Sequence, residues 1–171
     1  AEALLEEMYD AFVAGDESVK PDVRSFSTVL DAWSKSASPE APQRAEQILS
    51  RMLKHVDSGE RVTEPNYVCY NTVINCWAKS RQSGAAERAE SILRDMQDRY
   101  KAGDEDLKPN VITYSSVINA YAKTGNSEGA EALLEEMYDA FVAGDESVKP
   151  DVRSFSTVLD AWSKSASPEA P

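Results

Sequence analysis

Internal repetition constrains this chain more than any other feature. Residues 130–171 repeat residues 1–42 letter for letter. The offset of 129 residues divides into three steps, because four prolines are spaced 44, 44 and 41 residues apart: Pro21, Pro65, Pro109 and Pro150. A period of this length is typical of a supersecondary unit that buries its apolar face only by stacking on its neighbours. The sequence therefore predicts a tandem array.

Two kinds of helix are expected to alternate along the array. An A helix follows each of these four prolines, begins at an Asp or Asn cap and carries large apolar residues at helical spacing, as Phe26, Leu30 and Trp33 do. A B helix carries the pattern Ala-Glu-x-Leu/Ile-Leu-x-x-Met and ends before a glycine, as in residues 1–14. The first and last A helices are predicted over about 22–36 and 151–165.

Each helix, of either type, has one apolar stripe and a charged back, and a single hairpin cannot cover the apolar stripes of both its helices. Stacked hairpins cover them, so the predicted fold is all-α, an α-solenoid of antiparallel helical hairpins in the order B, A-B, A-B, A-B, A. We expect one helical-repeat domain over residues 1–171. Its predicted parts are a B helix alone (1–19), three repeats (20–63, 64–107 and 108–148) and an A helix alone (149–171).

Composition limits the setting and the partners. The net charge of -12 and the pI near 4.5 argue against a protein that binds polyanions in general. The sequence contains no run of 18 apolar residues, so it predicts no membrane span. Cys69 and Cys76 are expected to be buried free thiols, which fits an intracellular protein.

Four segments carry the most specific sequence pattern: Val111-Ile-Thr-Tyr114, Tyr121-Ala-Lys123-Thr-Gly125, Ala130 to Met137, and Pro150-Asp151. This pattern resembles the pentatricopeptide repeat family, in a variant with lengthened repeats of 41–44 residues. The tetratricopeptide pattern shares the hairpin architecture and fits these spacings less well. The resemblance implies an α-solenoid that reads single-stranded RNA one base per repeat.

The resemblance also implies which residues would contact RNA. Two side chains per repeat would set base preference, and the complete pairs are Ser27 with Asn66, Asn71 with Asn110, and Ser115 with Asp151. By family analogy these pairs would favour adenine, a pyrimidine and guanine in turn. Side chains that stack on bases are implied at Arg24, Val68, Ile112 and Arg153. Lysines that contact phosphate are implied at Lys35, Lys79, Lys123 and Lys164.

A second interpretation of these residues involves no RNA. Asp22, Asn66, Asn110 and Asp151 are also good helix N-caps. A lysine in the last turn of a helix complements the helix dipole without any ligand. Both interpretations stay open at the level of sequence.

The sequence offers no catalytic constellation, no cofactor motif and no metal-ligand set, and it predicts that the protein is not an enzyme. His55 is interpreted as a surface residue, and two cysteines are too few ligands for a zinc site. The neighbouring carboxylates of Glu135 and Glu136 are interpreted as a solvated helix face.

We therefore expect a non-enzymatic helical-repeat scaffold that, by resemblance, binds single-stranded RNA along a concave face lined by the A helices. The alternative is a structural or protein-interaction solenoid, engineered or cut from a longer array, without RNA binding. Head-to-tail association of copies is also expected, because the first B helix and the last A helix have uncovered apolar residues such as Leu4 and Trp162.

Overall fold

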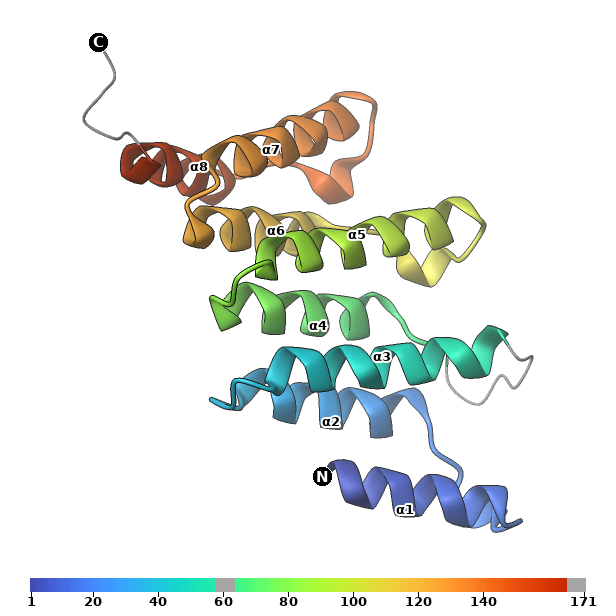
Figure 1. The fold of residues 1–171 in the computed structure, drawn as a ribbon. Helices are drawn as coiled ribbons and strands as arrows, with labels where there is room; N and C mark the ends of the chain where they lie inside the picture. Colours follow the sequence, from blue (N-terminus) through green and yellow to red (C-terminus); the bar gives the residue numbers. More distant parts are fainter. Residues whose placement is uncertain (58–63, 166–171) are drawn as a thin grey trace. The chain divides into compact units, whose positions relative to one another are not determined.

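The structure, a computed structural model, describes residues 1–57 and 64–165, with no side chain described at 55–57. Over these ranges all regular secondary structure is helical (Figure 1). The α-helices are α1 (Glu2–Val13), α2 (Val23–Lys35), α3 (Ala41–Asp57), α4 (Tyr67–Ser80), α5 (Ala85–Lys101), α6 (Val111–Thr124), α7 (Ser127–Val142) and α8 (Val152–Ser165). Single turns of 3-10 helix lie at η1 (Glu17–Val19), η2 (Glu105–Leu107) and η3 (Glu146–Val148). The predicted all-α class is confirmed, with B helices at odd and A helices at even α numbers.

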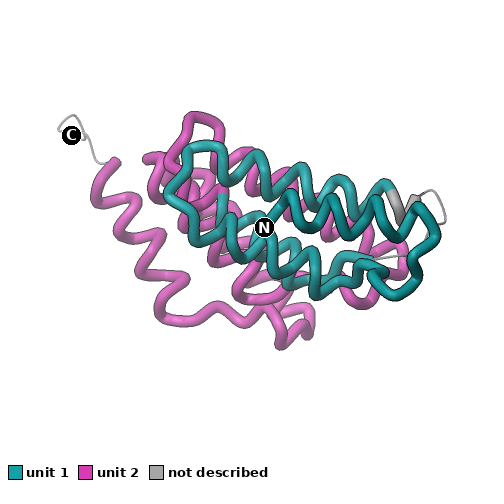
Figure 2. The backbone as a smooth tube through the Cα atoms, turned by 90° about the horizontal axis from the view of Figure 1, so that it is seen from below, with its two compact units in different colours: residues 1–76 teal, residues 77–171 magenta. Residues whose placement is uncertain are grey.

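The chain divides into two compact units, residues 1–76 and 77–171, and α4 crosses the boundary between them (Figure 2). In unit 1, α2 packs against both α1 and α3. In unit 2, α6 packs against α5, α7 and α8, and α7 also packs against α8. Within each unit, helices that follow one another along the chain pack together, which is the packing order of an α-solenoid.

The core of each unit consists of the apolar stripes that the sequence pattern predicts. Leu30 of α2 and Met52 of α3 are fully buried in unit 1. Leu93 of α5, Ile118 of α6 and Met137 of α7 are fully buried in unit 2. A helix that buries one face in this way is held by packing more than by its own helical propensity.

The 3-10 turns that follow α1, α5 and α7 are not predicted by the sequence analysis. In η3 the Asp145 carboxylate accepts a hydrogen bond from the Ser147 N–H at 3.0 Å. This bond caps a single 3-10 turn, which the Val148 N–H closes by donating to the Asp145 carbonyl at 3.3 Å. The turn buries Val148, and the equivalent turn η2 buries Leu107. The turn therefore extends the core beyond the end of the helix.

Two glycines of α7 and its C-terminal turn are required by geometry. Gly144, just past the helix, has a φ of 105°, a conformation that favours glycine. Gly129, in the first turn, lies against Tyr121 of α6, and a Cβ atom there would be 2.9 Å from the Tyr121 Cδ1 atom. The predicted B-helix end at Gly59 lies outside the described residues.

The identical sequences of α2 and α8 offer a matched test of burial. Leu30 is 0% exposed and its counterpart Leu159 is 69% exposed. We expect Leu30→Ala to lower the free energy of unfolding by about 2–5 kcal/mol, because it leaves a cavity in a packed core. Leu159→Ala should cost less than about 1 kcal/mol. Urea denaturation followed by circular dichroism measures both, and equal costs would contradict the assigned packing.

Candidate nucleic-acid interface

The four residues that precede the A helices all cap those helices. The Asp22 Oδ1 atom accepts a hydrogen bond from the Ser25 N–H at 2.8 Å, and the Asp151 Oδ1 atom accepts one from the Ser154 N–H at the same distance. The Oδ1 atoms of Asn66 and Asn110 each accept from two backbone N–H groups. The capping interpretation is therefore confirmed, and it occupies only one of the two terminal atoms of each side chain.

Capping also fixes the charge state of the two aspartates. Backbone and side-chain hydrogen bonds from Ser25 hold the pKa of Asp22 below its usual value. Ser154 has the same effect on the pKa of Asp151. Each carboxylate therefore stays ionised at neutral pH. Its second oxygen can accept a hydrogen bond but cannot donate one.

Four of the residues implied in base contact meet in unit 2, where α6 and α8 pack together. Ile112, Ser115, Asp151 and Arg153 line a hollow of about 490 Å³. Ile112 and Ser115 are one helical turn apart on α6, whereas Asp151 caps α8 and Arg153 lies in its first turn. The hollow thus combines an apolar wall, a hydroxyl, a carboxylate and a guanidinium.

A second hollow, of about 540 Å³, adjoins the first because Asn119 and Thr157 line both. Lys123 and Lys164, two of the lysines implied in phosphate contact, line it together with Arg81. Along α6 the residues Ser115, Asn119 and Lys123 follow at intervals of four, so they lie on one face of the helix. The sequence analysis did not include Asn119, although this spacing marks it.

The lysines of the four A helices differ in their partners. Lys35 and Lys164 form ion pairs with the aspartate four residues earlier, Asp31 at 2.6 Å and Asp160 at 2.5 Å. Lys79 and Lys123 have an asparagine at that position, Asn75 and Asn119. Two lysines are therefore neutralised within their own helices.

Lys123 lies in a cationic environment. Its Nζ atom donates to the backbone carbonyl of Ala78 at 3.3 Å. Burial, and then the positive charges of Arg81 and Lys79, lower the pKa of Lys123 from its ordinary value. A cluster of cations that destabilise one another is a favourable place for an anion.

The other implied residues are less closely grouped. In unit 1 the Ser27 hydroxyl donates to the backbone carbonyl of Arg24 at 3.1 Å, and Val68 is exposed on the first turn of α4. Asn71 belongs to unit 1, whereas Asn110, its implied partner, belongs to unit 2. The side chain of His55 lies outside the described residues.

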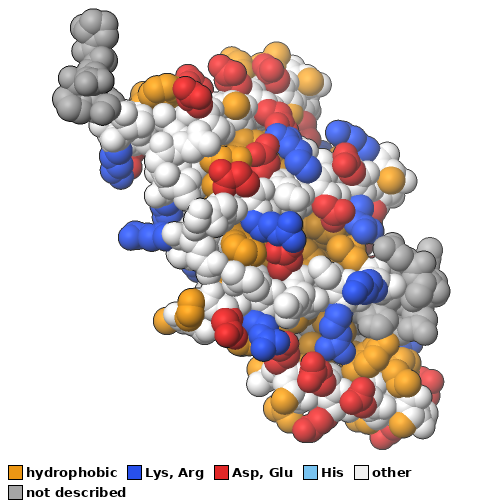
Figure 3. All heavy atoms as spheres, in the orientation of Figure 1, with side chains coloured by type: hydrophobic (Ala, Val, Ile, Leu, Met, Phe, Trp, Pro, Cys, Tyr) orange, Lys and Arg blue, Asp and Glu red, His pale blue; other side chains and the backbone are white. Residues whose placement is uncertain are grey.

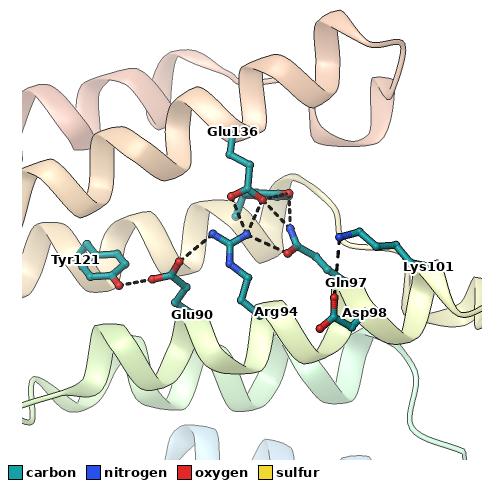
Figure 4. Close-up of polar contacts among 8 residues, drawn as sticks. Glu90, Arg94, Gln97, Asp98, Lys101, Tyr121 and Glu136 are labelled. Carbon is teal, nitrogen blue, oxygen red and sulfur yellow. Dashed lines mark hydrogen bonds and ion pairs between the residues drawn. The ribbon is translucent and has the colours of Figure 1, made fainter.

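A polar cluster in unit 2 was not predicted, and it corrects the interpretation of one glutamate. Glu136 of α7 is half-buried, and Figure 4 shows its carboxylate pointing at Arg94 and Gln97 of α5. Arg94 and Gln97 each donate to it at 2.7 Å, and the Tyr114 hydroxyl donates at 3.0 Å. Arg94 also bonds to Glu90, which accepts from the Tyr121 hydroxyl. Glu136 therefore joins α5, α6 and α7 and is not part of a solvated face.

The electrostatics of this cluster follow from its geometry. Burial raises the pKa of Glu136, but the hydrogen bonds from Arg94 and Gln97 outweigh burial, and the net pKa is lowered. Burial and then the Glu136 charge raise the pKa of Tyr114, which keeps its hydroxyl as a donor. The Glu136 carboxylate is thus held ionised among three donors, and we assign the cluster to structure.

The cysteines belong to the core. Cys69 and Cys76 are buried and outside any disulfide, as expected. Among the described residues, no helix is long and apolar enough to cross a membrane. The same residues contain no group of three or more His, Cys, Asp or Glu side chains that could hold a metal ion.

Consecutively packed helical hairpins define this chain as an α-helical repeat protein. Residues 68–100 and 105–138 each match a family model described as a PPR repeat. Each matched segment contains most of one A helix and most of the B helix after it. These two segments of the chain are therefore pentatricopeptide repeats. No curated protein matches the chain.

The Glu136 cluster predicts a pH-dependent contribution to stability. Because the folded-state pKa of Glu136 is lowered, its contribution is complete above the unfolded pKa of about 4.3 and is lost as pH falls through the folded pKa. Glu136→Gln should cost about 1–2 kcal/mol at pH 7, and the difference from wild type should shrink toward pH 3. Urea denaturation across this range measures it. Glu135→Gln, at the exposed neighbouring carboxylate, is the control, and an equal effect there would argue against the cluster.

Proposed function

We propose that the protein binds single-stranded RNA along the faces of its A helices. Proteins of the pentatricopeptide repeat family typically bind single-stranded RNA and are generally not enzymes. The observation that carries the proposal is the pair of adjoining hollows between α6 and α8. One is lined by the residues implied in base contact, and the other by Lys123 and Lys164, which would meet the backbone phosphates.

The capping geometry supports a chemical basis for base preference. Asp151 offers its second oxygen as an acceptor, which complements the N–H donors on the Watson–Crick edge of guanine. Asn66 and Asn110 have their Oδ1 atoms engaged and offer amide N–H donors. Those donors complement the ring-nitrogen acceptors of adenine and cytosine. We therefore propose guanine for Ser115 with Asp151, adenine for Ser27 with Asn66, and a pyrimidine for Asn71 with Asn110.

The acidic net charge does not exclude this function, because the charges are distributed unevenly. Many of the carboxylates lie on B helices and in the turns after them, as Glu135, Asp139 and Glu146 do. Lys123 and Lys164 instead line a hollow beside A helices. Phosphate contacts supply much of the affinity for nucleic acids, so the proposal requires these lysines.

The direct test removes the A-helix lysines. We expect wild type to bind labelled single-stranded RNA pools saturably and more weakly as salt rises, measured by fluorescence anisotropy. Changing Lys35, Lys79, Lys123 and Lys164 to Ala together should weaken binding at least about ten-fold and flatten the salt dependence. The control is a quadruple change to Ala of lysines outside the interface, at positions 20, 101, 108 and 149. Binding that survives the first variant, or is lost equally in the control, would refute the proposed interface.

The intrahelical ion pairs yield a second, opposite prediction. Asp31 and Asp160 hold Lys35 and Lys164, so changing both aspartates to Asn should free the lysines for phosphate. RNA affinity at low salt should rise several-fold, with a salt slope steeper by up to about 1.4, or about 0.7 for each phosphate gained. The control is Asp10→Asn with Asp139→Asn, an equal change of charge on B helices. The same gain in the control would assign the effect to net charge alone.

A protein-interaction solenoid is the second candidate function, and a specific observation favours it. The α8 residues Phe155, Leu159 and Trp162 are exposed, as is Leu4 of α1. Such surfaces can take a partner helix or a second copy of the chain, head to tail. Sedimentation velocity separates these forms, because only self-association makes the chain alone sediment faster at higher concentration.

A further inference from the structure

A groove of about 690 Å³ lies between α7 and α8 in unit 2. Its apolar lining includes Leu134, Phe155 and Leu159, and its acidic lining includes Glu131 and Glu135. In Figure 3 the part of the molecule formed by α7 and α8 shows apolar side chains next to acidic ones. The groove therefore offers a long apolar floor with negative charge beside it.

Unit 1 contains the same surface with a helix on it. The described residues 130–165 repeat residues 1–36, so the α7–α8 surface has the sequence of the α1–α2 surface. In unit 1, α3 packs against α2, and Phe26 is 1% exposed, whereas its counterpart Phe155 is 46% exposed. Leu30 and Leu159 differ in the same direction. The groove is thus the counterpart of a surface that α3 covers elsewhere in the chain.

Two arginines of α3 form ion pairs with glutamates of α1. The Arg44 Nη1 atom lies 3.7 Å from the Glu2 Oε1 atom, and the Arg51 Nη1 atom lies 3.4 Å from the Glu6 Oε1 atom. The Arg51 guanidinium also lies over the Tyr9 ring, 5.6 Å from its centroid. The counterparts of the three partners are Glu131, Glu135 and Tyr138, and all three line the groove.

The groove has the same internal arrangement as the covered surface. The Trp162 Nε1 atom donates to the Glu131 Oε2 atom at 3.1 Å, as the Trp33 Nε1 atom donates to the Glu2 Oε2 atom at 3.2 Å. The hydrogen bond between the tryptophan and the glutamate is therefore the same in the covered surface of unit 1 and in the open groove of unit 2. A partner helix would meet a surface that needs little rearrangement.

We propose that this groove binds an amphipathic helix with two arginines seven positions apart, in the pattern of α3. The inference rests on the second candidate function and names its partner. The apolar stripe of the helix, equivalent to Ile48, Leu49 and Met52, covers Phe155 and Leu159. Its arginines pair with Glu131 and Glu135.

The charge of the groove selects against the α1 helix of a second copy. Aligned on the shared Ala-Glu pattern, Glu7 of α1 stands where Arg51 stands in α3. Docking α1 would therefore bring the Glu7 carboxylate toward the Glu135 carboxylate. Like charges at an interface disfavour the wrong partner, so an arginine-bearing helix is the better fit.

The test uses the full chain and a labelled peptide with the sequence of residues 41–57. Fluorescence anisotropy should show saturable binding. Glu135→Arg should weaken it at least about ten-fold, and a peptide with Arg51→Glu should recover affinity for that variant. Glu146→Arg, an equal change of charge on η3 away from the groove, should leave binding unchanged. This control excludes an effect of net charge.

Three results would overturn the proposal. One is no binding of the peptide at millimolar protein, and another is equal binding to wild type and Glu135→Arg. The third is that the chain sediments as a concentration-dependent oligomer while the peptide fails to compete. This last result would assign the groove to a second copy, and the protein-interaction function itself would stand. Loss of RNA binding in the lysine variant is independent of all three.

Discussion

The structure depends on the burial of one apolar stripe per helix by the next helix along the chain. Each helix is charged on its other side, so no helix or hairpin covers its own stripe. Where the next helix is present, as α3 is for α2, residues such as Leu30 are removed from water completely. Burial of a leucine side chain contributes about 1.5–3 kcal/mol, and this gain recurs at each contact between neighbours. The stability of each unit is therefore built up locally, hairpin by hairpin.

The architecture could be predicted because its signals are local and repeated. Helical periodicity, a cap after each proline and a glycine after most B helices set the element order, and the predicted A helices over 22–36 and 151–165 match α2 and α8 within a residue. The 3-10 turns could not be predicted in the same way. Glu-Ser-Val has no strong propensity for one, and the turn at η3 forms because Asp145 bonds to Ser147 and Val148 reaches the core.

The duplicated sequence shows most directly what a local pattern cannot determine. Glu7 and Glu136 occupy the same position of an identical segment. Glu7 is exposed, whereas Glu136 is half-buried and bonded to Arg94 and Gln97. The difference lies in α5, which supplies the donors, so the role of this glutamate depends on a partner about 40 residues away. The candidate site is similar, because helical spacing places Ser115 and Lys123 on one face of α6, but only packing brings Asp151 beside Ser115.

The capping of the A helices has a consequence for the cost of recognition. An aspartate side chain on a free surface samples several rotamers, and a ligand that contacts it must arrest that motion. The Asp151 carboxylate is already held by the Ser154 N–H and hydroxyl, at 2.8 and 2.9 Å. Its rotational entropy is lost during folding, before any ligand arrives. A contact made to its remaining oxygen therefore begins from an oriented acceptor, and one group both starts a helix and presents a ready-made recognition element.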